Sequence, residues 1–258
     1  HGGTIGDSFV TPITYVQKSA PFMVSYKVAE NNQFGYQEQL NQRMFDAMSS
    51  LRAGINAYAI AQLSALKTQV TTGSGLLAWD EVNFKYKNTT GDSNVAKQSS
   101  RIKAIARKNK YGGSLDIIGG QQLVSDMMHY SAQGAANATN YGYQFNGVSL
   151  AEEEEIDETT LGANGFGYVI PSGLVGMTSW NEGINRSGLG DVGNNEGLFT
   201  TIQDPIIPNL RYDVHVVRGT ADTDLGGGNV FYQDVVDKYE VTAIYSLSHA
   251  MISTADET

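Results

Sequence analysis

One long stretch without proline limits the possible folds of this chain more than any other feature. From Tyr36 to Val70, apolar residues recur every three or four positions, which is the period of a helix with one apolar stripe. The stripe consists of Leu40, Met44, Met48, Leu51, Ile55, Ala59, Leu63, Leu66 and Val70. Gly54 is the weak position, because glycine lowers helix stability by about 1 kcal/mol relative to alanine. Such a helix would be roughly 50 Å long.

The opposite face of this predicted helix is polar. It carries Glu38, Gln42, Arg43, Asp46, Arg52, Asn56 and Lys67. A polar face excludes a membrane span and a fully buried rod. We therefore expect the helix to pack on a sheet along one side and to serve as a scaffold.

Composition narrows the class of protein further. The chain has 258 residues, enough for one large or two modest domains, and 41% of them are hydrophobic, which argues against disorder. A formal charge of −10 argues against tight, sequence-independent binding to nucleic-acid phosphates. The absence of cysteine excludes disulfides, thiolate zinc sites and cysteine nucleophiles. Because the chain begins at His1, we expect residue 1 to follow a cleavage or the trimming of a longer leader.

Shorter patterns predict the remaining elements. β-branched and aromatic runs predict strands, and apolar residues at helical spacing predict two more helices. The predicted strands are Val10–Val16, Phe22–Val28, Val82–Lys87, Ser114–Gly120, Gly147–Leu150, Gly165–Pro171, Tyr212–Arg218 and Asp234–Met251. The predicted helices are Ser93–Asn109, with Val95, Ile102, Ile105 and Ala106 inward, and Gln121–Ala132, with Leu123, Val124, Met127 and Met128. Glycine-rich Trp180–Gly197 is expected to be a loop, and Ala221–Gly228 a turn.

A basic cluster lies on the predicted helix Ser93–Asn109 and on the residue directly after it. Six of the seventeen lysines and arginines fall there: Lys97, Arg101, Lys103, Arg107, Lys108 and Lys110. One interpretation is a solvated face near a helix C-terminus, where cations are favoured. The other is a contact with an acidic neighbour, for example another subunit.

Several strings resemble chemical motifs, each with a simpler interpretation. Gly188–Gly193 matches GxGxxG, but no helix is predicted after it, so a loop is expected. The acidic run Glu152–Glu155 with Asp157 and Glu158 could hold a hard cation or be a solvated face. Asp222-Thr223-Asp224 begins like a calcium loop, but glycine and glutamine occupy the later ligand positions.

The other functional residue types show no useful spacing. The histidines His1, His129, His215 and His249 are far apart, and no serine-nucleophile elbow occurs. Glycosylation sequons at Asn88, Asn137 and Asn185 matter only for a secreted chain. We therefore nominate no catalytic, cofactor-binding or metal-binding residue, and we expect a protein that is not an enzyme.

The order of these elements resembles the major capsid proteins of tailed phages, the Hong Kong 97-like fold family. Phe22–Val28 followed by Tyr36–Val70 resembles the family's passage from a strand into its spine helix. Ile117-Ile118-Gly119 with Gln121–Ala132, ahead of Phe145-Asn146-Gly147-Val148, resembles its axial domain, and Tyr239–Ile252 its closing strand.

The resemblance implies an α+β fold with a long spine helix, long C-terminal strands and an α/β axial domain. It divides the chain into an N-terminal arm and extended strand (1–35), the spine helix and peripheral domain (36–110), the axial domain (111–200) and the return strands (201–258).

The same resemblance implies a structural role. The chain would be a shell subunit that forms pentamers and hexamers of an icosahedral head enclosing viral DNA. Its partners would be other copies of itself, decoration or scaffolding proteins, and packaged DNA bound without sequence specificity, with no membrane. It would reside in the virion after assembly in the host cytoplasm, without a cofactor. Fourteen tyrosines suit a protein of many interfaces.

Two other classes stay open. An encapsulin-like nanocompartment shell shares the fold and would be distinguished by a co-purified cargo enzyme. A secreted β-rich binding or adhesion protein would suit the Asn/Gly/Thr loops and the tyrosines, and it would be a monomer that binds a glycan or a surface.

Overall fold

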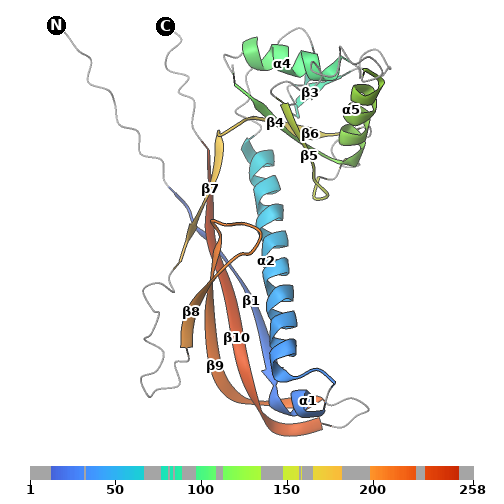
Figure 1. Ribbon diagram of the computed structural model, residues 1–258. Helices are drawn as coiled ribbons and strands as arrows, with labels where there is room; N and C mark the ends of the chain where they lie inside the picture. Colours follow the sequence, from blue (N-terminus) through green and yellow to red (C-terminus); the bar gives the residue numbers. More distant parts are fainter. Residues whose placement is uncertain are drawn as a thin grey trace, which may run out of the picture. The chain divides into compact units, whose positions relative to one another are not determined.

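The computed structural model describes residues 13–31, 33–66, 77–80, 82–83, 85–88, 97–108, 113–134, 148–156, 158, 165–181, 198–224 and 230–249. Helices and mostly antiparallel strands give an α+β fold (Figure 1). The chain forms two compact units: unit 1 takes its described residues from His1–Ile55 and Met177–Ser248, and unit 2 from Asn56–Gly176 and His249–Thr258. The division into four segments stays a prediction.

The predicted long helix is confirmed as α2, Tyr36–Leu66, an uninterrupted run of 31 residues (Figure 1); residues 67–70 lie outside the described part. Within its predicted stripe, Leu51 and Ile55 are buried most deeply, and Ala47, which was not assigned to the stripe, is buried as well. On the polar face, Glu38, Gln42, Arg43 and Asp46 are exposed as predicted. Arg52 and Asn56 were wrongly assigned to solvent: both are partly buried, because each makes a polar contact within its own unit.

Unit 1 is built on an antiparallel sheet with the strand order β1-β10-β9-β8. These strands are β1 (Val16–Ser25), β10 (Val230–His249), β9 (Arg211–Asp224) and β8 (Leu198–Gln203), and β7 (Val175–Trp180) also pairs with β10. The long C-terminal strand is thus confirmed over residues 234–249, and its 20 residues make it the longest described strand.

Several predicted boundaries in unit 1 were wrong. The strand expected to run to Val28 ends at Ser25, and Tyr26–Asn31 forms the short helix α1. The Ser25 side chain explains the change, since its Oγ accepts a hydrogen bond from the Val28 N–H at 3.0 Å, as a helix N-cap does. At the start of the chain, Ile13–Tyr15 lie outside any strand.

Two loop predictions failed as well. Ala221–Asp224 continue β9 instead of turning, and Trp180 ends β7 instead of opening a loop. Residues 182–197 and 225–229 lie outside the described part. Strands β7 and β8 were not predicted, because neither is deeply buried: their side chains range from half-buried to exposed.

The core of unit 1 is formed mainly by side chains of β1, β9 and β10 and by Leu210, directly before β9. Its most completely buried side chains are Val24, Leu210, Tyr212, Val214, Val236, Val241 and Tyr245. Val241, Ala243 and Tyr245 alternate along one face of β10 and are all buried. Ile244 and Ser246, on the opposite face of the strand, are buried too, so this part of β10 is covered on both faces.

Unit 2 is a small α/β arrangement. Strand β4 (Leu115–Gly119) lies between β5 (Val148–Glu152), to which it is parallel, and β6 (Gly167–Pro171), to which it is antiparallel. Helices α4 (Gln98–Lys108) and α5 (Gln121–Gly134) complete its core, which contains Ala106, Leu115, Ile117, Leu123, Met127 and Val148. Predicted positions of β4, α5, β5 and β6 are confirmed, except that Met128 is 59% exposed.

A hairpin replaces the single strand predicted at Val82–Lys87. It consists of β2 (Ala78–Asp80) and β3 (Lys85–Lys87). Val82 and Asn83 form its turn because both of their N–H groups donate to the Asp80 carboxylate, at 3.1 and 3.2 Å. Helix α4 begins only at Gln98, with Lys97 in a turn before it.

Candidate functional site: a polar cluster that anchors two helix starts to the sheet

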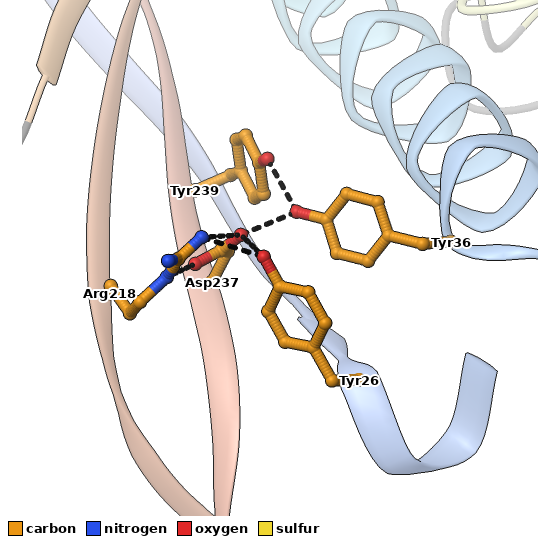
Figure 2. Close-up of polar contacts among 5 residues, drawn as sticks. All are labelled: Tyr26, Tyr36, Arg218, Asp237 and Tyr239. Carbon is orange, nitrogen blue, oxygen red and sulfur yellow. Dashed lines mark hydrogen bonds and ion pairs between the residues drawn. The ribbon is translucent and has the colours of Figure 1, made fainter. Parts of the chain in front are cut away.

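Five polar side chains from four elements of unit 1 meet in one cluster (Figure 2). Tyr26 is the first residue of α1, and Tyr36 is the first residue of α2. Arg218 lies on β9, while Asp237 and Tyr239 lie on β10. We call these five residues the anchor cluster. It joins the starts of two helices to the two long strands of the sheet.

The Asp237 carboxylate is the centre of the anchor cluster. Its Oδ2 accepts hydrogen bonds from the Tyr26 hydroxyl at 2.8 Å and the Tyr36 hydroxyl at 2.6 Å, and its Oδ1 accepts one from Arg218 Nε at 2.9 Å (Figure 2). Arg218 also donates to the Tyr26 oxygen at 2.7 Å. Because Tyr36 gives its single hydrogen to Asp237, we infer that Tyr239 is the donor in the 2.9 Å contact between these two phenols.

Charge and burial perturb the cluster's acid–base properties. Burial alone would raise the pKa of Asp237, but the hydrogen bonds from Arg218, Tyr36 and Tyr26 outweigh it and lower that pKa. The pKa of Tyr36 is raised by burial and by its hydrogen bond to Asp237. The hydrogen bond to Asp237 likewise raises the pKa of Tyr26. The cluster therefore holds an ionised carboxylate among protonated phenols.

Aromatic packing supports these polar contacts. The Tyr26 and Tyr36 rings stack with centroids 4.9 Å apart, and Phe22 of β1 stacks on Tyr239 at 5.0 Å. The Arg218 guanidinium lies 5.4 Å from the Tyr26 ring centroid. The helix starts are thus fixed by ring contacts as well as by hydrogen bonds.

Two further ties hold α2 to unit 1 beyond its first turn. Arg52 lies 3.8 Å from the buried Asp204 carboxylate, which also accepts a hydrogen bond from the Tyr212 hydroxyl at 2.5 Å. Lys18 of β1 donates to the Gly54 carbonyl at 3.3 Å. A Cβ at position 54 would lie 3.2 Å from the Lys18 side chain, so the helix's weakest position is also where β1 approaches closely.

Asp204 has the same electrostatic character as Asp237. Burial would raise its pKa, but the hydrogen bonds from Tyr212 and from the backbone N–H groups of Ile207 and Ile206 outweigh burial and lower it. Burial and the contact with Asp204 raise the pKa of Tyr212. The carboxylates of Asp204 and Asp237 both accept hydrogen bonds: Asp237 from three other elements, and Asp204 from Tyr212 and from two N–H groups of its own loop.

The chemistry of the anchor cluster suits the positioning of α1 and α2. A phenol with a raised pKa is a poor nucleophile at neutral pH, and the Asp237 carboxylate already accepts hydrogen bonds on both oxygens. Its groups instead fix where α1 and α2 leave the sheet. Sequence reasoning missed all five residues as a group. The sequence feature that could have pointed to the anchor cluster was Asp237, since aspartate is uncommon inside a strand of β-branched residues.

In the acidic run, Glu152, Glu154 and Glu155 are exposed, as the solvated-face interpretation expects, and Asp157 lies outside the described residues, whereas Glu158 and Glu153 make structural contacts. The Glu158 carboxylate accepts hydrogen bonds from the N–H groups of Gln122 and Leu123 at 2.8 and 3.1 Å, and from that of Phe166 at 3.2 Å. It thereby satisfies donors in the first turn of α5. Glu153 accepts a hydrogen bond from Asn56 at 2.7 Å.

Among the described residues, the other candidate motifs and the histidines do not come together in one site. Asp222 lies in β9, where its carboxylate accepts a hydrogen bond from the Gln233 N–H at 3.0 Å. His215 stacks on Phe199 at 4.1 Å. The GxGxxG string at 188–193, His1, Asn137 and Asn185 lie outside the described residues.

In the described part of the chain, no group of three or more histidine, aspartate or glutamate side chains could hold a metal ion. Among the described helices, none combines the length and the apolar character needed to cross a membrane.

Comparison with known proteins gives distant structural likenesses. The sequence matches no protein-family model and no curated protein. A chain from Mycobacterium phage Che8 is similar with a TM-score of 0.47 and 10% identity, over 91% of this chain and 66% of that one. A chain from Mycobacterium phage Cain is similar with a TM-score of 0.48 and 10% identity, over 98% and 76%.

Proposed function

We propose that this chain is a structural shell subunit, a major capsid protein of the Hong Kong 97-like fold. Many copies would assemble as pentamers and hexamers into an icosahedral head that encloses viral DNA. The protein would be a virion component, assembled in the host cytoplasm, and it would not be an enzyme.

The attachment of α2 to unit 1 carries this proposal. A helix of 31 residues is about 46 Å long. Its polar ties at Tyr36 and Arg52 are 16 residues apart, which places them about 24 Å apart along the helix axis. Buried Ala47 and Leu51 lie between the two ties, and buried Ile55 lies one turn beyond Arg52. A long helix held at several points makes a stiff brace, which is what a thin wall subunit requires.

The surface of unit 1 supports contact with other copies. Its exposed large apolar side chains are Ile13, Tyr15, Met23, Phe34, Phe45, Trp180, Leu198, Ile206 and Val235. Aromatic residues and methionine are enriched in protein interfaces. Decoration or scaffolding proteins could use the same surface. With a net charge of −10, the chain would hold packaged DNA weakly and without sequence specificity.

Electron microscopy tests the proposal directly. The full-length product is expressed alone and with any scaffolding protein encoded beside it, and it is then examined by negative staining and sedimentation across a salt series. We expect closed shells of uniform size.

The other outcomes separate the alternatives. Shells that contain a co-purified enzyme and no DNA would indicate an encapsulin-like compartment. Monomers that bind a glycan array would indicate a secreted adhesion protein. Monomers under every condition would overturn the proposal.

A further inference from the structure

Helix α4 carries a basic face in unit 2. Arg107 and Lys108 lie in its last turn and are exposed, and Lys97 is exposed just before its first turn. The opposite side of the helix is apolar, since Ile105 and Ala106 are buried. Packing on the core therefore forces the charged side of α4 outward.

An acidic segment lies on the same unit. It consists of Glu152–Glu155, directly after β5, and the side chains of Glu152, Glu154 and Glu155 are exposed. Glu153 is partly buried because it accepts a hydrogen bond from Asn56. The exposed carboxylates thus share one short stretch whose backbone is held by its neighbours.

Helix α4 and the acidic segment are both tied to β4 in unit 2. Ala106 of α4 belongs to the core cluster that includes Leu115, the first residue of β4. Glu152 pairs with Gly119, the last residue of β4. The two ends of a five-residue strand are about 13 Å apart. Figure 1 shows α4 along one edge of unit 2.

Association between copies has an electrostatic obstacle. Each copy carries a net charge of −10, so two copies repel one another on average. A local pairing of opposite charges is needed to steer them together. The segment from Lys97 to Lys110 has six basic residues and no acidic one, whereas 152–155 is entirely acidic.

We propose that the basic face of α4 in one copy docks against the acidic segment Glu152–Glu155 of a neighbouring copy. This inference rests on the proposed function and names the contact between adjacent subunits. Because the two surfaces are different patches of the same chain, the contact is head-to-tail. Repeated contacts of this kind close into a ring when the rotation between copies permits.

Charge reversal and its compensation test this contact. One variant carries Arg107→Glu and Lys108→Glu, a second carries Glu154→Lys and Glu155→Lys, and a third combines all four changes. Asp46→Lys, on the exposed face of α2, is the matched control. Circular dichroism and thermal unfolding establish that each variant is folded. Light scattering then measures the assembly rate at about 0.02 and about 0.3 M salt, which changes the screening length severalfold.

We expect each double reversal to slow assembly roughly tenfold or more at low salt, and the combined variant to recover most of the wild-type rate. High salt should slow the wild type and narrow these differences. Double reversals that assemble like Asp46→Lys, or a folded combined variant without recovery, would overturn the docking contact while the shell proposal stands. Reversal of the α4 charges that abolishes DNA binding but leaves assembly unchanged would assign the basic face to nucleic acid instead. A wild type that never assembles would overturn both.

Discussion

The anchor cluster makes a quantitative prediction for Asp237→Asn. Asparagine keeps the shape and one acceptor oxygen of aspartate but loses its negative charge. Asp237 is 6% exposed and accepts hydrogen bonds from two phenols and a guanidinium. We expect the free energy of unfolding of unit 1 to fall by about 2–4 kcal/mol.

This magnitude follows from the individual contacts. A hydrogen bond to a charged group contributes roughly 1.5–3 kcal/mol. In the variant, the remaining oxygen can accept a hydrogen from one phenol, so part of the contribution is retained. The Arg218 side chain is 68% exposed and regains water, so its ion pair adds little. The loss is therefore smaller than the sum of the bonds.

Tryptophan fluorescence during urea denaturation can measure this effect in unit 1 alone. The chain has two tryptophans, Trp79 in unit 2 and Trp180 in unit 1, so a Trp79→Phe background leaves one reporter for unit 1. Glu240→Gln, at an exposed position on the same strand, is the control and should change stability by no more than about 0.5 kcal/mol.

A double-mutant cycle shows whether the cluster acts as a unit. Tyr36→Phe removes the hydroxyl that donates to Asp237, so its effect should overlap with that of Asp237→Asn by about 0.5 kcal/mol or more. Additive effects, or an Asp237→Asn variant as stable as Glu240→Gln, would refute the anchoring role of the carboxylate.

Three further predictions concern pH, the α5 cap and close packing. Because the pKa of Asp237 is lower folded than unfolded, its stabilisation is complete at neutral pH and is lost as the pH falls below about 4. Wild type and Asp237→Asn should then converge in an acid titration of unfolding; parallel curves would contradict this. Glu158→Gln should destabilise unit 2 by about 1–3 kcal/mol, followed through Trp79 in a Trp180→Phe background, whereas exposed Glu154→Gln should be near neutral. In the same assay Gly167→Ala should cost about 1–3 kcal/mol, because its Cβ would lie 2.8 Å from a backbone oxygen of β4, whereas Gly113→Ala, with open space around it, should be tolerated.

The elements that could be predicted are those whose signal repeats locally. Helix α2 shows its apolar period over many turns, so the sequence alone located its start and established its unbroken length as far as Leu66. The run Leu115–Gly119 is short and apolar, and the helix after it follows at once, so β4 and α5 were also found. Such patterns can be recognised in a sequence because each successive turn of a helix, or each successive residue pair of a strand, repeats the same signal.

Local strand and helix patterns failed where a helix cap or a distant contact decided the outcome. Tyr26 and Val28 continue an alternating strand pattern, yet the Ser25 cap turns them into a helix. Arg52 sits on the polar side of the predicted stripe, yet a carboxylate from the far end of the chain draws it toward the sheet. Charged residues are assigned to solvent by default, so the partner of Arg52 could not be inferred from the sequence.

The sequence by itself determined the long helix, the apolar strands and the absence of disulfides. Only the tertiary structure decided what the polar residues do. Tyr26 and Asp237 are 211 positions apart and meet because β1 pairs with β10 in a register that places Val24 opposite Asp237. Periodicity reports which face of an element is apolar, but the partner of a single carboxylate depends on how strands from the two ends of the chain align.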